Sequence, residues 1–140
     1  MSKILAILSL TVVLLVGHVS SKAEAQPIGP YCFSIAPFAN QFVFFFNFNG
    51  GNQYSGTGRD FLSNTPMTAT LFVTGDIVAL GFTVMTPPTG TGHLFSGSAH
   101  LNAFTGIGPG RCETLNASGG CGTGTAITMA LIACQPGATS

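Results

Sequence analysis

The chain has 140 residues, of which only 6% are charged, whereas about 25% is ordinary for a soluble domain. Hydrophobic residues make up 46% of the chain, and phenylalanine alone accounts for 12 positions. So few charges exclude a basic nucleic-acid-binding surface, and so much apolar side chain excludes a charged disordered chain.

Residues 1–25 predict a secretory signal peptide. Lys3 supplies the positive charge, residues 4–16 form an apolar run, and Ala23 and Ala25 are the small residues that signal peptidase requires. The apolar run is too short to span a bilayer. We therefore expect a single mature domain, residues 26–140, that is secreted or periplasmic and has no transmembrane anchor after cleavage. Its side chains carry two positive and three negative charges, a net charge of −1.

The mature region predicts short strands separated by turns. The clearest strand is residues 41–48, where Phe42, Phe44, Phe46 and Phe48 share one face because strand side chains alternate. Gly, Asn and Pro predict turns at residues 49–52, 74–76, 86–92 and 106–110. The predicted strands are residues 31–35, 41–48, 53–59, 67–73, 77–85, 93–102, 111–115 and 122–134.

About eight short strands at hairpin spacing predict an all-β fold, either a small antiparallel barrel or a sandwich. Glycines lie within several of these strands, and glycine is useful where a strand bends sharply around a small barrel. We therefore favour the barrel. The glycines concerned are Gly56, Gly58, Gly81, Gly97 and Gly124.

An even number of cysteines in a small exported domain predicts disulfides. The four cysteines allow three pairings, of which we favour Cys32–Cys134 and Cys112–Cys121. The first joins the two ends of the domain, and the second closes a short Gly-rich loop. The spacing contains no C-x₂-C pair, and no His lies near a Cys, so we expect no zinc site.

The segment 31–38, Tyr-Cys-Phe-Ser-Ile-Ala-Pro-Phe, is followed by alternating strands and a final Cys134. This arrangement resembles that of small secreted bacterial proteins whose strand pattern is similar to lipocalin- and avidin-type β-barrels. The resemblance implies a lipocalin-like barrel. The chain has no Trp, so the Gly-x-Trp signature of lipocalins is absent and no functional residue is carried over.

The phenylalanine stripe either fills the interior of the barrel or lines an apolar pocket, because small barrels can hold one small ligand. Sequence alone leaves both interpretations open. The candidate ligand-binding residues are Phe42, Phe44, Phe46 and Phe82.

Candidates for catalysis are few. His93 and His100 are seven residues apart on one predicted strand, so they face opposite sides and cannot easily share a ligand. Nucleophile motifs and phosphate-binding loops are absent from the sequence, which leans against an enzyme and implies no cofactor.

Four of the five charged side chains in the mature region form two pairs along the sequence. Arg59 and Asp60 are expected to be exposed at a strand end, and Arg111 and Glu113 to point to the same side of another strand.

We therefore expect a secreted, non-catalytic β-barrel that binds an apolar small molecule or a partner. The alternative is a self-associating structural or cell-surface protein, since near-zero charge removes the repulsion that keeps proteins apart and would permit a homo-oligomer. An outer-membrane barrel and an exported enzyme are weaker alternatives.

Overall fold

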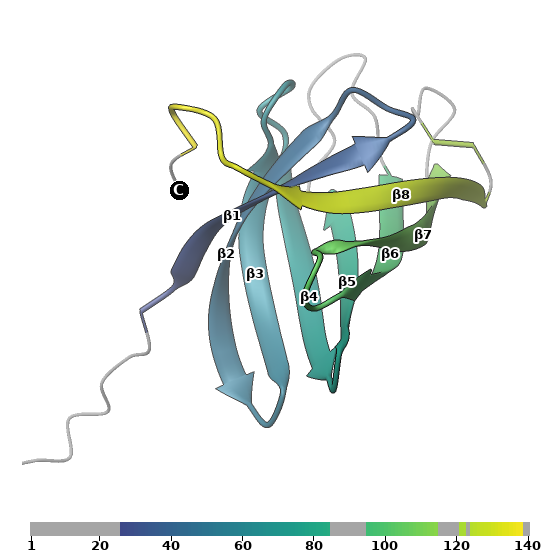
Figure 1. Ribbon diagram of the computed structural model, residues 1–140. Helices are drawn as coiled ribbons and strands as arrows, with labels where there is room; N and C mark the ends of the chain where they lie inside the picture. The colour runs from purple at the N-terminus through teal and green to yellow at the C-terminus, as the bar shows by residue number, and fades with distance from the viewer. Residues whose placement is uncertain (1–25, 85–94, 115–120, 123, 139–140) are drawn as a thin grey trace, which may run out of the picture.

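The structure is a computed structural model that describes residues 26–84, 95–114, 121, 122 and 124–138. Eight antiparallel strands form one closed barrel, in which each strand pairs with the next along the chain and β8 pairs with β1 (Figure 1). The strands are β1 (Ile28–Ala36), β2 (Gln41–Gly50), β3 (Gln53–Asp60), β4 (Pro66–Thr74), β5 (Ile77–Val84), β6 (Phe95–Asn102), β7 (Ile107–Thr114) and β8 (Thr125–Ile132). The predicted all-β barrel of about eight strands is confirmed.

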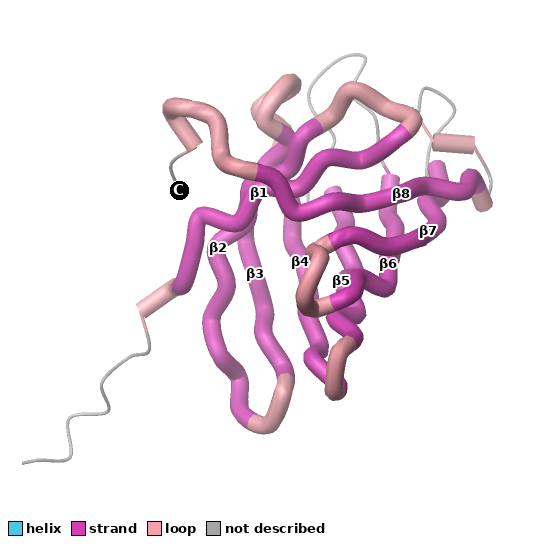
Figure 2. The backbone as a smooth tube through the Cα atoms, in the orientation of Figure 1, coloured by secondary structure: helices cyan, strands magenta, loops and turns pink. Residues whose placement is uncertain are grey.

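Because neighbouring strands are antiparallel, the connections between them alternate between the two ends of the barrel. One carries the tight turns after β2 and β4, the loop after β6, the start of β1 and the end of β8 (Figure 2). We call this the hairpin end. The other is the opposite end, where the β1–β2 and β3–β4 loops lie. The predicted signal peptide, the loop at 86–92 and His93 lie outside the described residues.

One predicted turn is wrong. Residues 107–110, which the sequence assigns to a turn, belong to β7, and the turn closes at Gly106, whose φ is +69°. Gly108 is required for close approach rather than for turning, because a Cβ there would lie 1.8 Å from the carbonyl oxygen of His100 on β6. Pro109 is tolerated in the strand, where its ring points outward and is exposed.

The inward-facing side chains form one apolar core. Phe42, Phe44 and Phe46 are each 1% exposed or less, and the Phe42 ring lies 5.2 Å from Phe82. Phe48 continues the same stripe but is 52% exposed, because it lies beyond the core at the hairpin end. The remaining buried apolar residues include Phe33, Ile35, Met67, Ala69, Leu80, Val84, Phe95, Ala99, Leu101, Ile127 and Met129.

Glycines opposite the phenylalanines make this core possible. Phe44 pairs with Gly58 across β2 and β3, and Phe82 pairs with Gly97 across β5 and β6. A Cβ at Gly58 would lie 2.6 Å from the Phe44 ring, and one at Gly97 would lie 2.4 Å from the Phe82 ring. Each large ring therefore occupies the space that a side chain on the neighbouring strand would otherwise fill.

Both favoured disulfides are present, Cys32–Cys134 across 102 residues and Cys112–Cys121 across nine. Two disulfides and no free cysteine are typical of an oxidising, extracytoplasmic environment.

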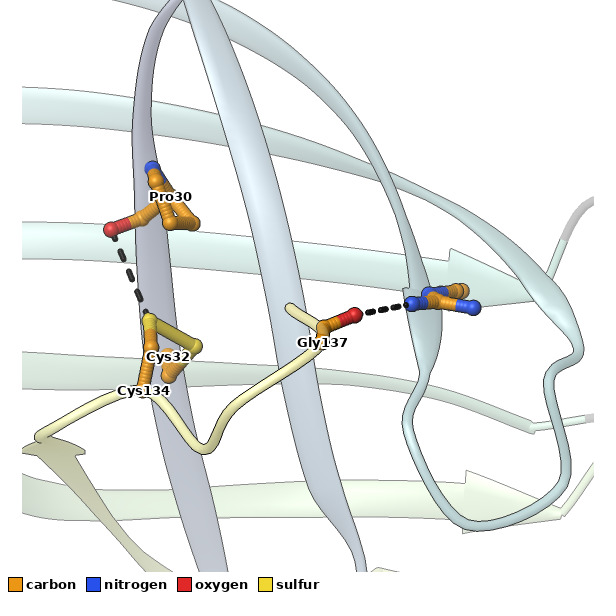
Figure 3. The surroundings of a disulfide bond; sticks show 5 residues. Pro30, Cys32, Cys134 and Gly137 are labelled. Atoms are coloured by element: carbon orange, nitrogen blue, oxygen red, sulfur yellow. Dashed lines mark hydrogen bonds between the residues drawn. A yellow bond between two sulfur atoms is a disulfide. The ribbon is translucent and has the colours of Figure 1, made fainter. Parts of the chain in front are cut away.

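The first disulfide attaches the C-terminal segment, residues 133–138, to the outside of the barrel (Figure 3). Further along this segment, the carbonyl oxygen of Gly137 accepts a hydrogen bond of 2.9 Å from Arg59 Nη2 on β3. Val43 on β2 lies between Cys32 and Arg59 in the strand register. Val43 is 1% exposed although it points outward, since this segment crosses over it.

The expectation that Arg59 and Asp60 are exposed is wrong. Asp60 is 2% exposed, and its carboxylate accepts hydrogen bonds from the Asn40 side-chain amide (2.6 Å) and from the backbone N–H groups of Leu62 (2.9 Å) and Ser63 (3.4 Å). These bonds connect the β1–β2 and β3–β4 loops at the opposite end. Arg59 is half-buried because its guanidinium supports the C-terminal segment.

Candidate functional site

An apolar cavity opens at the hairpin end of the barrel. Its volume is about 250 Å³, and its lining residues come from seven of the eight strands and from the β6–β7 loop. We call it the mouth. It is lined by Ile28, Tyr31, Phe33, Phe46, Tyr54, Leu71, Val73, Val78, Leu101, Asn102, Ala103, Gly106 and Leu131.

The depth of the mouth is set by the core beneath it. Phe33, Phe46 and Leu101 are 1–3% exposed and form its closed floor. Half-buried Leu71 and Val78 form its walls. Their side chains point inward like those of the core, since the alternation of side chains continues beyond the core toward the strand ends. The cavity is therefore the unfilled last layer of the barrel interior.

Few polar groups reach this cavity. Two tyrosines line it, and the Tyr31 ring packs 6.0 Å from the Phe46 ring. Asn102 is also at the edge, but its side-chain oxygen already accepts hydrogen bonds from the backbone N–H groups of Phe104 (2.9 Å) and Thr105 (3.0 Å). The mouth is suited to an apolar occupant with little need for hydrogen bonds.

The candidate ligand-binding residues lie at different depths. Phe46 lines the mouth, whereas Phe42, Phe44 and Phe82 lie in the core and pack against one another with exposed fractions of 2% or less. The structure thus brings one of the four to the cavity.

Several lining residues were not singled out from the sequence, namely Tyr31, Tyr54, Leu71, Val73, Leu101 and Leu131. The alternation indicates that such side chains face inward. The alternation does not indicate which inward-facing side chains lie between the packed core and the hairpin end, because that depends on how the strands are staggered around the barrel.

Among the residues that the structure describes, the charged side chains and His100 are spread over the outer surface and the opposite end of the barrel. Arg111 and Glu113 point outward from β7 on the same side, as predicted, and His100 is exposed on the outside of β6. Within the described ranges, no three of His, Cys, Asp or Glu come close enough to hold a metal ion.

A second hollow lies on the outer surface along β5, where Ala79 and Gly81 are small. Its larger part has a volume of about 470 Å³ and is lined mainly by hydroxyl groups and by Arg111 and Glu113. The hydroxyl groups belong to Thr68, Thr70, Thr83, Ser96 and Ser98. The larger part of this outer groove is polar, and the smaller part, of about 350 Å³, also has apolar lining residues such as Phe72 and Ala79. The mouth has the more strongly apolar lining of the two sites, so it is the better site for an apolar molecule.

Comparison with known proteins adds no assignment: no family model, curated protein or solved structure matches the chain. In the part of the chain that the structure describes, no helix is long and apolar enough to cross a membrane.

Proposed function

We propose that the protein is a secreted, non-catalytic β-barrel that binds an apolar small molecule in its mouth. The single observation that carries this proposal is the cavity of about 250 Å³ at the hairpin end, with its apolar walls and its floor of buried side chains. Water in such a cavity has few hydrogen-bonding partners, so its replacement by an apolar ligand is favourable.

The size of the cavity limits the ligand. At the packing density of organic crystals, about 250 Å³ accommodates roughly a dozen non-hydrogen atoms. A short acyl chain or a one- to two-ring hydrocarbon fits this limit. At roughly −0.5 kcal/mol per atom, such a ligand binds with a dissociation constant on the order of tens of micromolar.

The polarity of the cavity narrows the class further. The tyrosine side chains are the polar groups at its edge that are best placed to meet a ligand, because the Asn102 oxygen is engaged in the β6–β7 turn. We therefore expect an uncharged molecule with at most one hydroxyl or carbonyl group. A carboxylate buried there would lack a cationic partner, since Arg59 and Arg111 lie on the outer surface.

A fluorescent probe of this size, 1-aminonaphthalene, tests the proposal. The chain contains no Trp, so protein emission does not interfere with the probe. We expect saturable binding with a blue shift of the emission. Leu131 lines the mouth and is 45% exposed, so Leu131→Asp places a charge at the edge of the cavity with little effect on folding.

The matched control is Leu62→Asp, because Leu62 is 74% exposed in the β3–β4 loop at the opposite end. We expect Leu131→Asp to weaken probe binding at least tenfold and Leu62→Asp to leave it unchanged. Absence of saturable binding, or equal binding by the Leu131 variant and the wild type, would contradict the proposal.

A further inference from the structure

The exposed large hydrophobic side chains gather at one end of the barrel. Nine are exposed among the described residues, and eight of these belong to the hairpin end. The ninth, Leu62, lies at the opposite end. We call the eight the apolar rim: Ile28, Tyr31, Phe48, Phe72, Ile77, Phe104, Ile107 and Leu131.

The rim is a ring rather than a flat patch. Its members come from the start of β1, β5 and β7, the end of β2, β4 and β8, and the β6–β7 loop, so they are distributed around the barrel end. Ile28, Tyr31 and Leu131 line the mouth itself, whereas Phe72 borders the outer groove. Backbone hydrogen bonds hold the turns together, from the Val73 N–H to the Asn52 oxygen (3.0 Å) and from the Ala103 N–H to the Asp76 oxygen (2.8 Å). The ring is therefore built into the barrel end.

The described residues at this end carry little charge. In the described part of the chain, Asp76 is the one charged side chain in the hairpin-end turns. The other charged residues lie on β3 and β7 toward the opposite end. None of the eight rim residues is Lys or Arg, so the rim side chains themselves do not attract an anionic membrane or a phosphate-rich ligand.

We propose that the apolar rim docks on a zwitterionic lipid surface with no net charge, from which the mouth takes up its ligand. This inference rests on the proposed function, because it identifies the lipid phase as the source of the apolar molecule. Two features favour lipid: the rim is apolar without basic residues, and three of its members line a cavity that an apolar molecule could reach from the lipid without crossing water.

Phe104 is the residue most suited to testing the rim, since it is 88% exposed at the tip of the β6–β7 loop and does not line the mouth. Its ring would insert first, and burying a phenylalanine side chain contributes roughly a tenfold or greater change in partitioning. Phe104→Ser removes that ring without disturbing the core. Leu62→Ser is the matched control at the other end.

The experiment is flotation of the mature, disulfide-bonded protein with phosphatidylcholine vesicles, with and without added phosphatidylglycerol. We expect binding to phosphatidylcholine that does not increase with phosphatidylglycerol and does not fall with added salt. We expect Phe104→Ser to weaken it about tenfold and Leu62→Ser to leave it unchanged. Failure to float with either vesicle, or equal loss in both variants, would overturn the proposal.

A second copy of the chain is the rival occupant. Rim-to-rim pairing predicts a dimer by light scattering without lipid, which Phe104→Ser would dissociate. That result together with absence of vesicle binding would replace the lipid proposal by self-association.

The lipid proposal and the proposed function fail separately. Probe binding in solution should be unchanged in Phe104→Ser, because Phe104 lies outside the cavity. Vesicle binding without probe binding would remove the small-molecule function and with it ligand uptake, while retaining the docking surface. Probe binding without vesicle binding would remove only the lipid docking.

Discussion

The packing of phenylalanine against glycine makes a quantitative prediction for Gly97→Ala. The new Cβ would lie 2.4 Å from Cζ of Phe82 and 2.9 Å from the backbone oxygen of Arg111. Carbon atoms in contact are normally about 3.5–4.0 Å apart, so the overlap exceeds about 1 Å. Overpacking of this kind costs about 1–3 kcal/mol, while the lower entropy of the unfolded chain offsets about 0.4–1 kcal/mol of it.

We therefore expect Gly97→Ala to lower the free energy of unfolding by about 1–2 kcal/mol, measured by urea denaturation under non-reducing conditions. The corresponding shift of the midpoint is roughly 1 M. The control is Gly81→Ala on β5, where the Cβ would point outward and meet only Thr70 Oγ1 at 3.1 Å. That variant should be within about 0.5 kcal/mol of the wild type.

A double-mutant cycle separates ring overlap from a general effect of alanine. In a Phe82→Leu background the Gly97→Ala substitution should cost less, because the ring that it meets is gone. The reasoning would be refuted if Gly97→Ala were as stable as the wild type, or if its cost were the same with and without the Phe82 ring.

Two further predictions concern the segments that close the fold. Replacing Cys32 and Cys134 together by Ala opens a loop of 102 residues and should destabilise the protein by about 4.7 kcal/mol in the chain-entropy model. Limited proteolysis should then cut within residues 135–138, and an undiminished unfolding free energy would count against the role of this bond. Asp60→Ala leaves three hydrogen-bond donors without their acceptor and should cost about 3 kcal/mol by urea denaturation, more than Asp60→Asn, which keeps one oxygen. Equal stability of Asp60→Ala and the wild type would show that the two loops do not depend on this carboxylate.

The barrel could be predicted because its signals are local. The alternation of residues 41–48 identifies one face of β2, and the structure buries Phe42, Phe44 and Phe46 on that face. Asn and Gly at residues 49–52 mark the next turn. The favoured disulfides were also predictable, since Cys32 and Cys134 flank the domain and the first and last strands of a closed barrel are neighbours.

Other features depend on contacts between distant parts of the chain. The alternation of β2 places Val43 on the outer face, where exposure is expected, but the C-terminal segment, some 90 residues later in the chain, covers it. Asp60 was expected to be exposed because it lies at a strand end, and it is buried because hydrogen-bond donors of the neighbouring loops satisfy its carboxylate. The Gly-Pro-Gly at residues 108–110 has the composition of a turn, yet its glycines allow neighbouring strands to approach closely.

The mouth and its rim are the least predictable features. Phe46 and Phe48 are adjacent members of one stripe, yet the first forms the floor of the cavity and the second is exposed on the rim. This difference is set by the level at which the filled core stops, and that level depends on the packing of all eight strands.

A crystal structure of the mature protein soaked with iodobenzene tests the central claim most directly, because anomalous scattering locates the iodine. The account predicts one ordered molecule in the mouth, against Tyr31, Leu71 and Leu131. Iodine only in the outer groove along β5, or an undisturbed mouth at saturating ligand, would contradict it.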